Sequence, residues 1–221
     1  SDAPPERAVT THPEIIRALI RFLKKRGAYP AVADSPAGAL RVEQVWERTG
    51  IRAVCQSEQV PLINLEQAGS VHFNFEGISY SIARPILETD LLLNVPKVKT
   101  HVLTVLTAGV KNLYGTLPGF QKALLHRHFP TPRDMGRFLA HLAGQIRPAF
   151  TLADAIVGME GDGPSGGQPC SLGFLAAARN LWALDLTLCR LLNIPPSRVP
   201  YLDAAPVPAE THIEIVGDPP P

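Results

Sequence analysis

The sequence lacks a hydrophobic run long enough to cross a membrane, since no apolar stretch approaches the roughly 18 residues that a spanning helix needs. Its N-terminus also lacks the succession of charged, apolar and small residues that marks a signal peptide. An excess of charge of one sign is missing too: 21 Lys and Arg residues face 20 Asp and Glu residues, for a net charge of +1. Wrapping nucleic acid or an anionic membrane usually needs a strongly basic balance. We therefore expect a cytoplasmic protein that binds neither nucleic acid nor membranes.

Cysteine is scarce. Cys55, Cys170 and Cys189 lie far apart in the chain, and none of them belongs to a C-x-x-C spacing. This excludes a disulfide framework and a locally assembled zinc or iron–sulfur site. We expect reduced thiols and leave the cofactor unknown, with a divalent metal as the open alternative.

The sequence is rich in proline and has enough apolar residues for a substantial core. The 22 prolines are about twice the usual share of roughly 5%, which predicts many element ends rather than disorder. At 221 residues the chain has the length of one domain. Helical and extended patterns alternate along it, which predicts a single α/β domain over residues 1–221, with a mostly parallel or mixed central sheet and helices on both faces.

Individual elements can be placed from capping residues and apolar periodicity. The segment from Thr10 to Gly27 predicts a helix, with a threonine cap, Pro13 in the first turn, basic residues late and a glycine stop. Residues 70–81 alternate with period two around Glu76-Gly77, which predicts a small β-hairpin insertion. The other expected helices cover residues 39–49, 102–113, a short segment ending near 126, 132–146 and 181–192. The other expected strands cover residues 31–35, 60–65, 90–95, 151–159, 172–178 and 211–216, with 90–95 and 151–159 as buried neighbours.

Basic and acidic residues are segregated along the chain. Residues 91–133 contain six Lys or Arg, three His and no Asp or Glu. Residues 147–178 contain Asp154, Glu160 and Asp162, and no basic residue after Arg147. If the two segments meet, a cationic pocket faces a carboxylate loop; the alternative is that both are solvated surface.

The helix expected over residues 102–113 would place several polar side chains on one stripe. At 100° per residue Thr104, Thr107 and Lys111 share a face with Thr100, which stands where an N-cap is expected. Free N–H groups of the first turn, together with Lys99, would then form an anion site at the carboxyl end of the preceding strand.

Carboxylates and a histidine supply candidate chemistry. Asp154 interrupts an apolar strand, so it must be paired, and Lys97 and Lys111 are candidate partners; a purely structural ion pair and a catalytic role both stay open. The glycine-rich loop 160–167 would let a backbone approach a ligand, and Glu160 with Asp162 could hold a divalent cation, although it matches no phosphate-loop or EF-hand pattern. His126 follows Lys122 by four residues and is a candidate base.

The chain resembles the domain-of-unknown-function family 362 over most of its length. The matching stretches are TTHPEIIRALIRFLKKRGA, LLLNVPKVKTHVLTVLTAGVKNLYGTLPG followed by His126, and LADAIVGMEGDGPSGG. The resemblance implies an α/β architecture, a further strand with a Lys-Pro-Asn-like motif before Ser1, and an association with ferredoxin-like modules that carry two four-iron clusters. The chain differs from the family at AARNLWALD, where Arg179 and Asn180 replace a Gly-Thr-Asp-like turn, although Asp185 matches. The resemblance implies where a functional site lies, but it implies no particular reaction.

Two functions follow as hypotheses. The first is an enzyme domain that binds a small phosphate or carboxylate, in which acid/base or metal chemistry is carried by Lys111, His126, Asp154 and Glu160. The ligand-binding residues would be Lys97, Lys99, Thr100, His101, Thr104, Asn112, Gly161 and Gly163. The rival is a non-catalytic module that docks with a ferredoxin-like iron–sulfur partner through exposed lysines. A weaker analogy links the run GVKNLYGTLPG and the following histidine to the proton or hydride chemistry of nickel-pincer lactate racemases.

Overall fold

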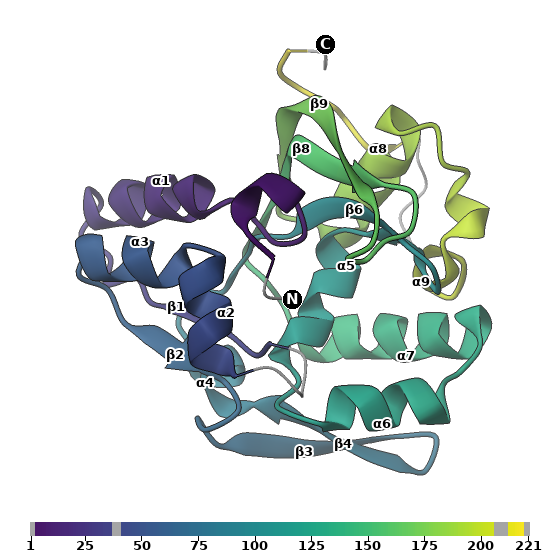
Figure 1. The fold of residues 1–221 in the computed structure, drawn as a ribbon. Coiled ribbons are helices and arrows are strands. Elements are labelled where there is room, and N and C mark those ends of the chain that lie inside the picture. The colour runs from purple at the N-terminus through teal and green to yellow at the C-terminus, as the bar shows by residue number, and fades with distance from the viewer. Residues whose placement is uncertain (1–2, 37–40, 206–211, 219–221) are drawn as a thin grey trace.

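The computed structural model describes residues 3–36, 41–205 and 212–218. Helices and strands are interleaved along these residues, which confirms the predicted α/β class (Figure 1). The chain begins with the short 3-10 helix η1 (Pro5–Arg7), followed by α1 (Pro13–Lys24), β1 (Val32–Asp34), α2 (Val42–Arg48), α3 (Ile51–Ser57) and β2 (Leu62–Asn64). Strands β1 and β2 pair in parallel as a small sheet of their own.

Helix α1 forms where the sequence predicts it, but its cap differs. The imidazole Nδ1 of His12 accepts the N–H of Glu14, so this histidine is the N-cap in place of the expected threonine. The Thr11 hydroxyl donates to the Val95 carbonyl, 2.6 Å away. The N-terminus of α1 is therefore tied directly to the chain that enters the main sheet.

Helix α3 was not expected. Gly50 lies between α2 and α3 with φ +75°, a left-handed conformation that glycine adopts without strain. This turn redirects the chain, and Val54 and Cys55 of α3 become buried. The expected helix over residues 39–49 is observed as α2, although residues 39 and 40 lie outside the described part of the chain.

The predicted hairpin is present as β3 (Ser70–Phe75) and β4 (Ile78–Ala83), followed by the short α4 (Arg84–Glu88). Glu76 and Gly77 both have positive φ at its turn. The hairpin contributes to the core, because the Phe75 ring lies 5.6 Å from that of Phe129 and 5.9 Å from that of Phe138.

The main sheet has five strands: β5 (Leu93–Asn94), β6 (Lys97–His101), β7 (Val105–Thr107), β8 (Phe150–Glu160) and β9 (Gln168–Ala178). Strand β8 pairs in parallel with β5 and β6 and antiparallel with β9, and β7 lies antiparallel to β6. The prediction that segments 90–95 and 151–159 are neighbours in one sheet is confirmed, although β5 is only two residues long.

The helix expected over residues 102–113 is wrong. The chain instead forms β6, a tight turn, β7 and only then the one-turn helix α5 (Gly109–Asn112), which the 3-10 helix η2 (Leu113–Thr116) continues. Five of the eight residues from Val98 to Val105 are β-branched, which favours extended backbone. The turn is closed by His101, whose Nδ1 accepts the N–H groups of Leu103 and Thr104. Thr100 is therefore a strand residue, and the polar stripe that starts at a helix N-terminus does not exist.

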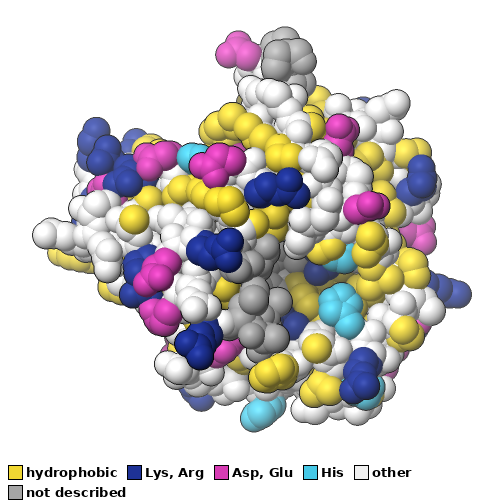
Figure 2. All heavy atoms as spheres, viewed as in Figure 1, with side chains coloured by type: hydrophobic (Ala, Val, Ile, Leu, Met, Phe, Trp, Pro, Cys, Tyr) yellow, Lys and Arg dark blue, Asp and Glu magenta, His cyan; other side chains and the backbone are white. Residues whose placement is uncertain are grey.

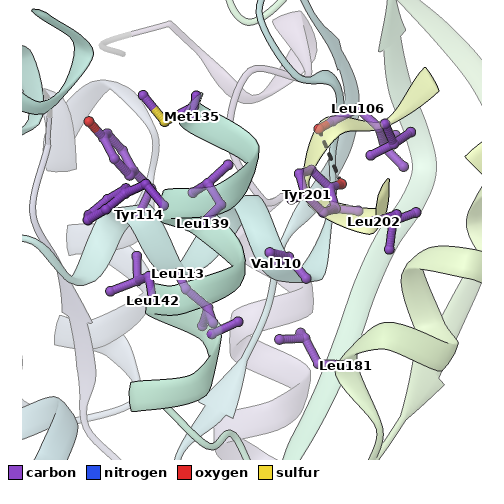
Figure 3. Close-up of a cluster of buried hydrophobic side chains, with 14 of the residues drawn as sticks. Leu106, Val110, Leu113, Tyr114, Met135, Leu139, Leu142, Leu181, Tyr201 and Leu202 are labelled. Atoms are coloured by element: carbon purple, nitrogen blue, oxygen red, sulfur yellow. Dashed lines mark hydrogen bonds between the residues drawn. The ribbon is translucent and has the colours of Figure 1, made fainter. Parts of the chain in front are cut away.

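The remaining helices enclose the core beside this sheet. They are α6 (Gln121–His128), α7 (Pro132–Gln145), α8 (Leu181–Leu191), the 3-10 turn η3 (Pro196–Arg198) and α9 (Pro200–Asp203). Side chains of α5, α7, α8 and α9 interdigitate, and the Tyr201 hydroxyl donates to the Leu106 carbonyl (Figure 3). The last expected strand is wrong for residues 212–216, which form no strand, and Thr211 lies outside the described residues. In the described ranges, no helix combines the length and the apolar character that a bilayer crossing requires.

Candidate functional site

Lys97 and Asp154 form a buried ion pair at the centre of the main sheet. Their side chains face each other across neighbouring strands with Nζ 2.5 Å from Oδ2, and they are 4% and 0% exposed. Asp154 also accepts the N–H of His12 at 2.8 Å, while Lys97 donates to the Val157 carbonyl at 2.9 Å. The expectation that Asp154 is buried with a lysine partner is confirmed. Every hydrogen bond named here joins Lys97 or Asp154 to another group of the protein.

The loop of residues 160–167 meets the end of β6, so the basic and acidic segments of the chain lie side by side here. The Thr100 hydroxyl donates to the Gly161 carbonyl at 2.9 Å, and Lys99 donates to the Pro164 carbonyl at 2.9 Å. Gly163 approaches Thr100 so closely that a β-carbon would lie 1.9 Å from the Thr100 carbonyl oxygen. The glycine content of the loop thus serves close packing of two chain segments.

The two carboxylates predicted as metal ligands are exposed on this loop. Glu160 and Asp162 face solvent. Within residues 3–36, 41–205 and 212–218, no three His, Cys, Asp or Glu side chains come together as a metal-binding group. The divalent-cation site at Glu160 and Asp162 stays a prediction.

Helix α5 carries Lys111 and is fixed at both ends. At its start, the buried Asp185 carboxylate accepts the N–H groups of Gly109 and Val110, at 2.7 and 3.0 Å. At its end, the Asn112 amide donates to Asn94 Oδ1 at 2.8 Å, and the Asn94 amide donates back to the Gly109 carbonyl at 2.9 Å. A one-turn helix has little stability alone, so these contacts determine where the Lys111 side chain projects.

Lys111 is a buried lysine without a carboxylate. Its side chain is 8% exposed, and its ammonium lies 4.2 Å from the centre of the Tyr114 ring, a cation–π contact. It has no hydrogen bond or ion pair with any residue in the described part of the chain. Burial, and then the charges of Lys99 and Lys122, lower the pKa of Lys111 to about 7.

Lys99 and Lys122 flank Lys111, and each has part of its donor capacity left. Lys99 donates to the carbonyls of Val9 and Pro164, at 2.6 and 2.9 Å. Lys122 donates to the Ser35 carbonyl and, at 2.8 Å, to the Ser35 hydroxyl. An ammonium has three N–H donors, so these bonds leave one on each. Burial lowers the pKa of both lysines to about 8; the charge of Lys97 adds to this effect at Lys99, whereas the charges of Asp34 and Glu66 oppose it at Lys122.

Two histidines complete the cluster. Burial, followed by the charges of Lys111, His126 and Lys99, lowers the pKa of His101 to about 3, so this imidazole is neutral near pH 7. Because its Nδ1 accepts two backbone N–H groups, the proton is assigned to Nε2, which leaves a neutral donor. The His126 ring lies 5.3 Å from the Tyr114 ring, and burial together with Lys111 lowers its pKa.

We call Lys99, His101, Lys111, Lys122 and His126 the basic cluster. Figure 2 shows one face of the molecule hollowed near its centre, with basic side-chain atoms inside the hollow and histidine side chains beside it. Of the sequence-predicted residues, the structure gathers Lys99, His101, Lys111 and His126, which come from β6, α5 and α6.

Other predicted residues have contacts elsewhere. Thr104 is fully buried and donates to the Leu106 carbonyl at 3.2 Å, and Asn112 is bonded to Asn94. Sequence reasoning missed Ser35, Asn94 and Tyr114, and it noted Asp185 only as a match to the family. Asn94, at the end of an otherwise apolar run, and Tyr114, three residues after Lys111, were the available signals.

Comparison with known proteins gives two findings. The family described as Domain of unknown function (DUF362) matches residues 1–190. The "Thylakoid-associated protein sll1697" of Synechocystis sp. (strain ATCC 27184 / PCC 6803 / Kazusa) is 31% identical over 205 residues, which make up 90% of this chain. The aligned part is 62% of that relative, so the chain spans less than two thirds of its length.

Proposed function

The chain belongs to the family described as Domain of unknown function (DUF362), whose description names no reaction, and we propose that its basic cluster binds a small ligand bearing a phosphate or carboxylate group. The observation that carries this proposal is the buried Lys111 ammonium without an anionic partner among the described residues. An unpaired buried cation is costly, and a bound anion offsets that cost.

The donors of the cluster suit such a ligand. Lys111 has all three N–H donors available, and Lys99 and Lys122 have one each beyond their bonds to the protein. His101 adds a neutral N–H donor. Charge-assisted hydrogen bonds of this kind are stronger than neutral ones, and several converging on one anion give both affinity and orientation.

Within this proposal, proton transfer is assigned to Lys111 and His126. Both have a lowered pKa, which brings Lys111 close to neutral pH. Asp154 is left out because its carboxylate is engaged by Lys97 and by the His12 N–H. Glu160 is left out because it is exposed, and it has no charge effect on His101 or Lys111 in the described structure.

The docking alternative needs lysines spread over an exposed face. Lys97, Lys111 and Lys122 are 4%, 8% and 8% exposed, so their ammonium groups are poorly placed to meet an acidic protein surface. This burial supports the small-anion proposal over docking with a ferredoxin-like partner. The partner itself stays a prediction from the family resemblance.

Thermal melts with and without sulfate, at ionic strength matched with chloride, test the proposal. We compare the native sequence with Lys111→Met and with Lys25→Met, a substitution of an exposed lysine at the end of α1. Sulfate should stabilise the native protein and the Lys25 variant, by about 2.7 kcal/mol at a hundredfold excess over Kd, and should not stabilise the Lys111 variant. Equal shifts in all three proteins would reduce the effect to general salt stabilisation and overturn the proposal.

A further inference from the structure

We propose that Lys111 forms a covalent imine with a carbonyl group of the ligand, and that the ligand is a 2-oxo acid whose carboxylate is held by the rest of the basic cluster. This inference rests on the proposed anion binding and specifies the substrate class of the same site. Its basis is the position of Lys111, whose amine has no hydrogen bond among the described residues, beside Lys99 and Lys122, which are hydrogen-bonded to the protein.

The Lys111 amine differs from the other three lysines around it. Lys97 is neutralised by Asp154, and Lys99 and Lys122 are each anchored by two hydrogen bonds to the protein. Lys111 contacts only an aromatic face through its ammonium, as far as the described residues show. Its nitrogen therefore keeps a lone pair available for bond formation whenever it is deprotonated.

The Lys111 backbone is held in place, which is what a nucleophile needs. Asp185 fixes the start of α5, and the pair of Asn94 and Asn112 fixes its end. Tyr114 is itself immobilised, because its hydroxyl donates to the Lys122 carbonyl at 2.7 Å. A positioned amine on a rigid element reacts faster than one on a flexible surface side chain, because the entropic cost of alignment has been met on folding.

A 2-oxo acid matches this arrangement because its carboxylate and its reactive carbonyl are joined by one bond. A remaining N–H donor of Lys99 or of Lys122, both of which act on Lys111 through their charge, would take the carboxylate and direct the adjacent carbonyl carbon to Lys111. The nitrogen lone pair adds to this carbon and gives a carbinolamine. The carbonyl oxygen then leaves as water with the two protons of the amine nitrogen, and a C=N bond replaces C=O. No oxidant or reductant is needed.

The protonation of Lys111 supports the chemistry. With a pKa of about 7, roughly half of the Lys111 side chains are neutral at pH 7, against about one in 2,500 for an exposed lysine with a pKa near 10.4. The His126 ring lies 5.3 Å from the Tyr114 ring and can relay the protons that leave nitrogen, because burial and Lys111 lower its pKa.

Reductive trapping tests the inference on the full chain. The protein is incubated at pH 7 with pyruvate and cyanoborohydride, which reduces imines, and the modified lysines are located by peptide mass spectrometry. We expect the reduced pyruvyl adduct at Lys111 in at least tenfold excess over Lys25, because the larger neutral fraction outweighs the lower basicity of the amine. Sulfate should slow the labelling of Lys111 and leave that of Lys25 unchanged.

The outcomes separate this inference from the anion site. Stabilisation by sulfate with no excess labelling at Lys111 overturns the imine and leaves anion binding intact. Labelling at Lys111 that sulfate does not slow overturns the assignment of a carboxylate-bearing ligand. Because the adduct is mapped on the native sequence, the test does not depend on a variant; Lys111→Arg, which keeps the charge and removes the amine nucleophile, should abolish labelling at this position alone.

Discussion

The Asp185 carboxylate lies 2.7 Å from the backbone nitrogen of Gly109, at the point where the chain enters the one-turn helix that carries Lys111. Asp185 is fully buried, and burial, opposed by its bonds to the Val110 and Gly109 N–H groups, raises its pKa to about 7. Asp185 thus changes its protonation near neutral pH while it holds the start of α5, the helix that carries Lys111 of the basic cluster.

We predict that Asp185 makes stability fall as pH rises from about 4 to about 7. The unfolded carboxyl ionises near 3.9, whereas the folded one keeps its proton until about 7, so the folded state binds more protons throughout this window. Replacing Asp185 with Asn removes this contribution. The free energy of unfolding of the native protein relative to Asp185→Asn should fall by about 2–3 kcal/mol between pH 5 and pH 8, measured by urea denaturation.

The comparison with the variant is needed because histidines act in the opposite direction. Burial lowers the pKa of His101, His126 and His141 in the folded protein. Their contribution to the free energy of unfolding therefore grows as pH rises toward their pKa in the unfolded chain, near 6.5. These shares are common to both proteins and cancel in the difference. A difference that does not change with pH would contradict the assignment to Asp185.

We predict that Gly109→Ala is destabilising. A β-carbon at this position would lie 2.6 Å from Leu181 Cδ1 and 2.9 Å from Asp185 Oδ1, so the contact between α5 and α8 must open. Overpacking of this kind costs about 1–3 kcal/mol. Gly144→Ala is the matched control: it lies in α7 with nothing within 4 Å of its β-carbon position, and it should gain up to about 1 kcal/mol from helix propensity. Thermal melts that rank the two variants in the reverse order would refute the packing argument.

The elements with strong local signals could be predicted from the sequence. Helix α1 has its proline, its apolar stripe and its basic end, and the β3–β4 hairpin has alternation on both sides of Glu76-Gly77. Strand β8 is apolar from Leu152 to Met159 apart from Asp154, whose burial required a partner that the sequence could narrow to two lysines. In each case the residues that determine the element are close together in the chain.

The site could be predicted only in part, because long-range pairing decides its geometry. The spacing of Thr100, Thr104, Thr107 and Lys111 fits a helix, yet pairing of β6 with β8 through the Lys97–Asp154 contact makes the first of these residues extended. Lys99, His101, Lys111 and His126 still come together as the sequence suggested, although Lys111 lies on the one-turn helix α5 and not on the longer helix that was expected. Tyr114 and Ser35 could not be assigned because their roles arise from contacts with Lys111 and Lys122.

We predict that breaking the Lys97–Asp154 pair is severely destabilising. Asp154→Ala leaves the Lys97 ammonium buried and unpaired and removes the acceptor of the His12 N–H, at a cost of about 3–5 kcal/mol. Glu160→Ala removes an exposed carboxylate from the end of the same strand and should change stability by less than about 0.5 kcal/mol. Urea denaturation distinguishes the two. In the double variant Lys97→Met, Asp154→Leu much of the lost stability should return, since no buried charge remains; a double variant as unstable as Asp154→Ala would show that hydrogen bonding to His12 dominates.

The last prediction concerns the stability cost of Lys111 itself. A lysine whose pKa falls from about 10.4 in the unfolded chain to about 7 in the folded one binds fewer protons when folded, so its burial lowers stability at neutral pH. Lys111→Met should therefore raise the free energy of unfolding at pH 7, by at most about 4 kcal/mol.

The difference in free energy of unfolding between the native protein and Lys111→Met should also depend on pH, and a change in packing alone would not produce such a dependence. From pH 7 to pH 9 the unfolded lysine keeps its proton while the folded one is increasingly neutral, so rising pH favours the folded state and the native protein should recover about 2 kcal/mol relative to Lys111→Met. Lys99 and Lys122 titrate in both proteins, and their shares largely cancel. Saturating sulfate at pH 7 should narrow the gap as well, because an anion beside the ammonium offsets its desolvation. A Lys111→Met protein that is less stable than the native one at pH 7, or a gap that stays constant from pH 7 to pH 9, would mean that Lys111 is compensated in the folded protein and that the cluster holds no uncommitted cation.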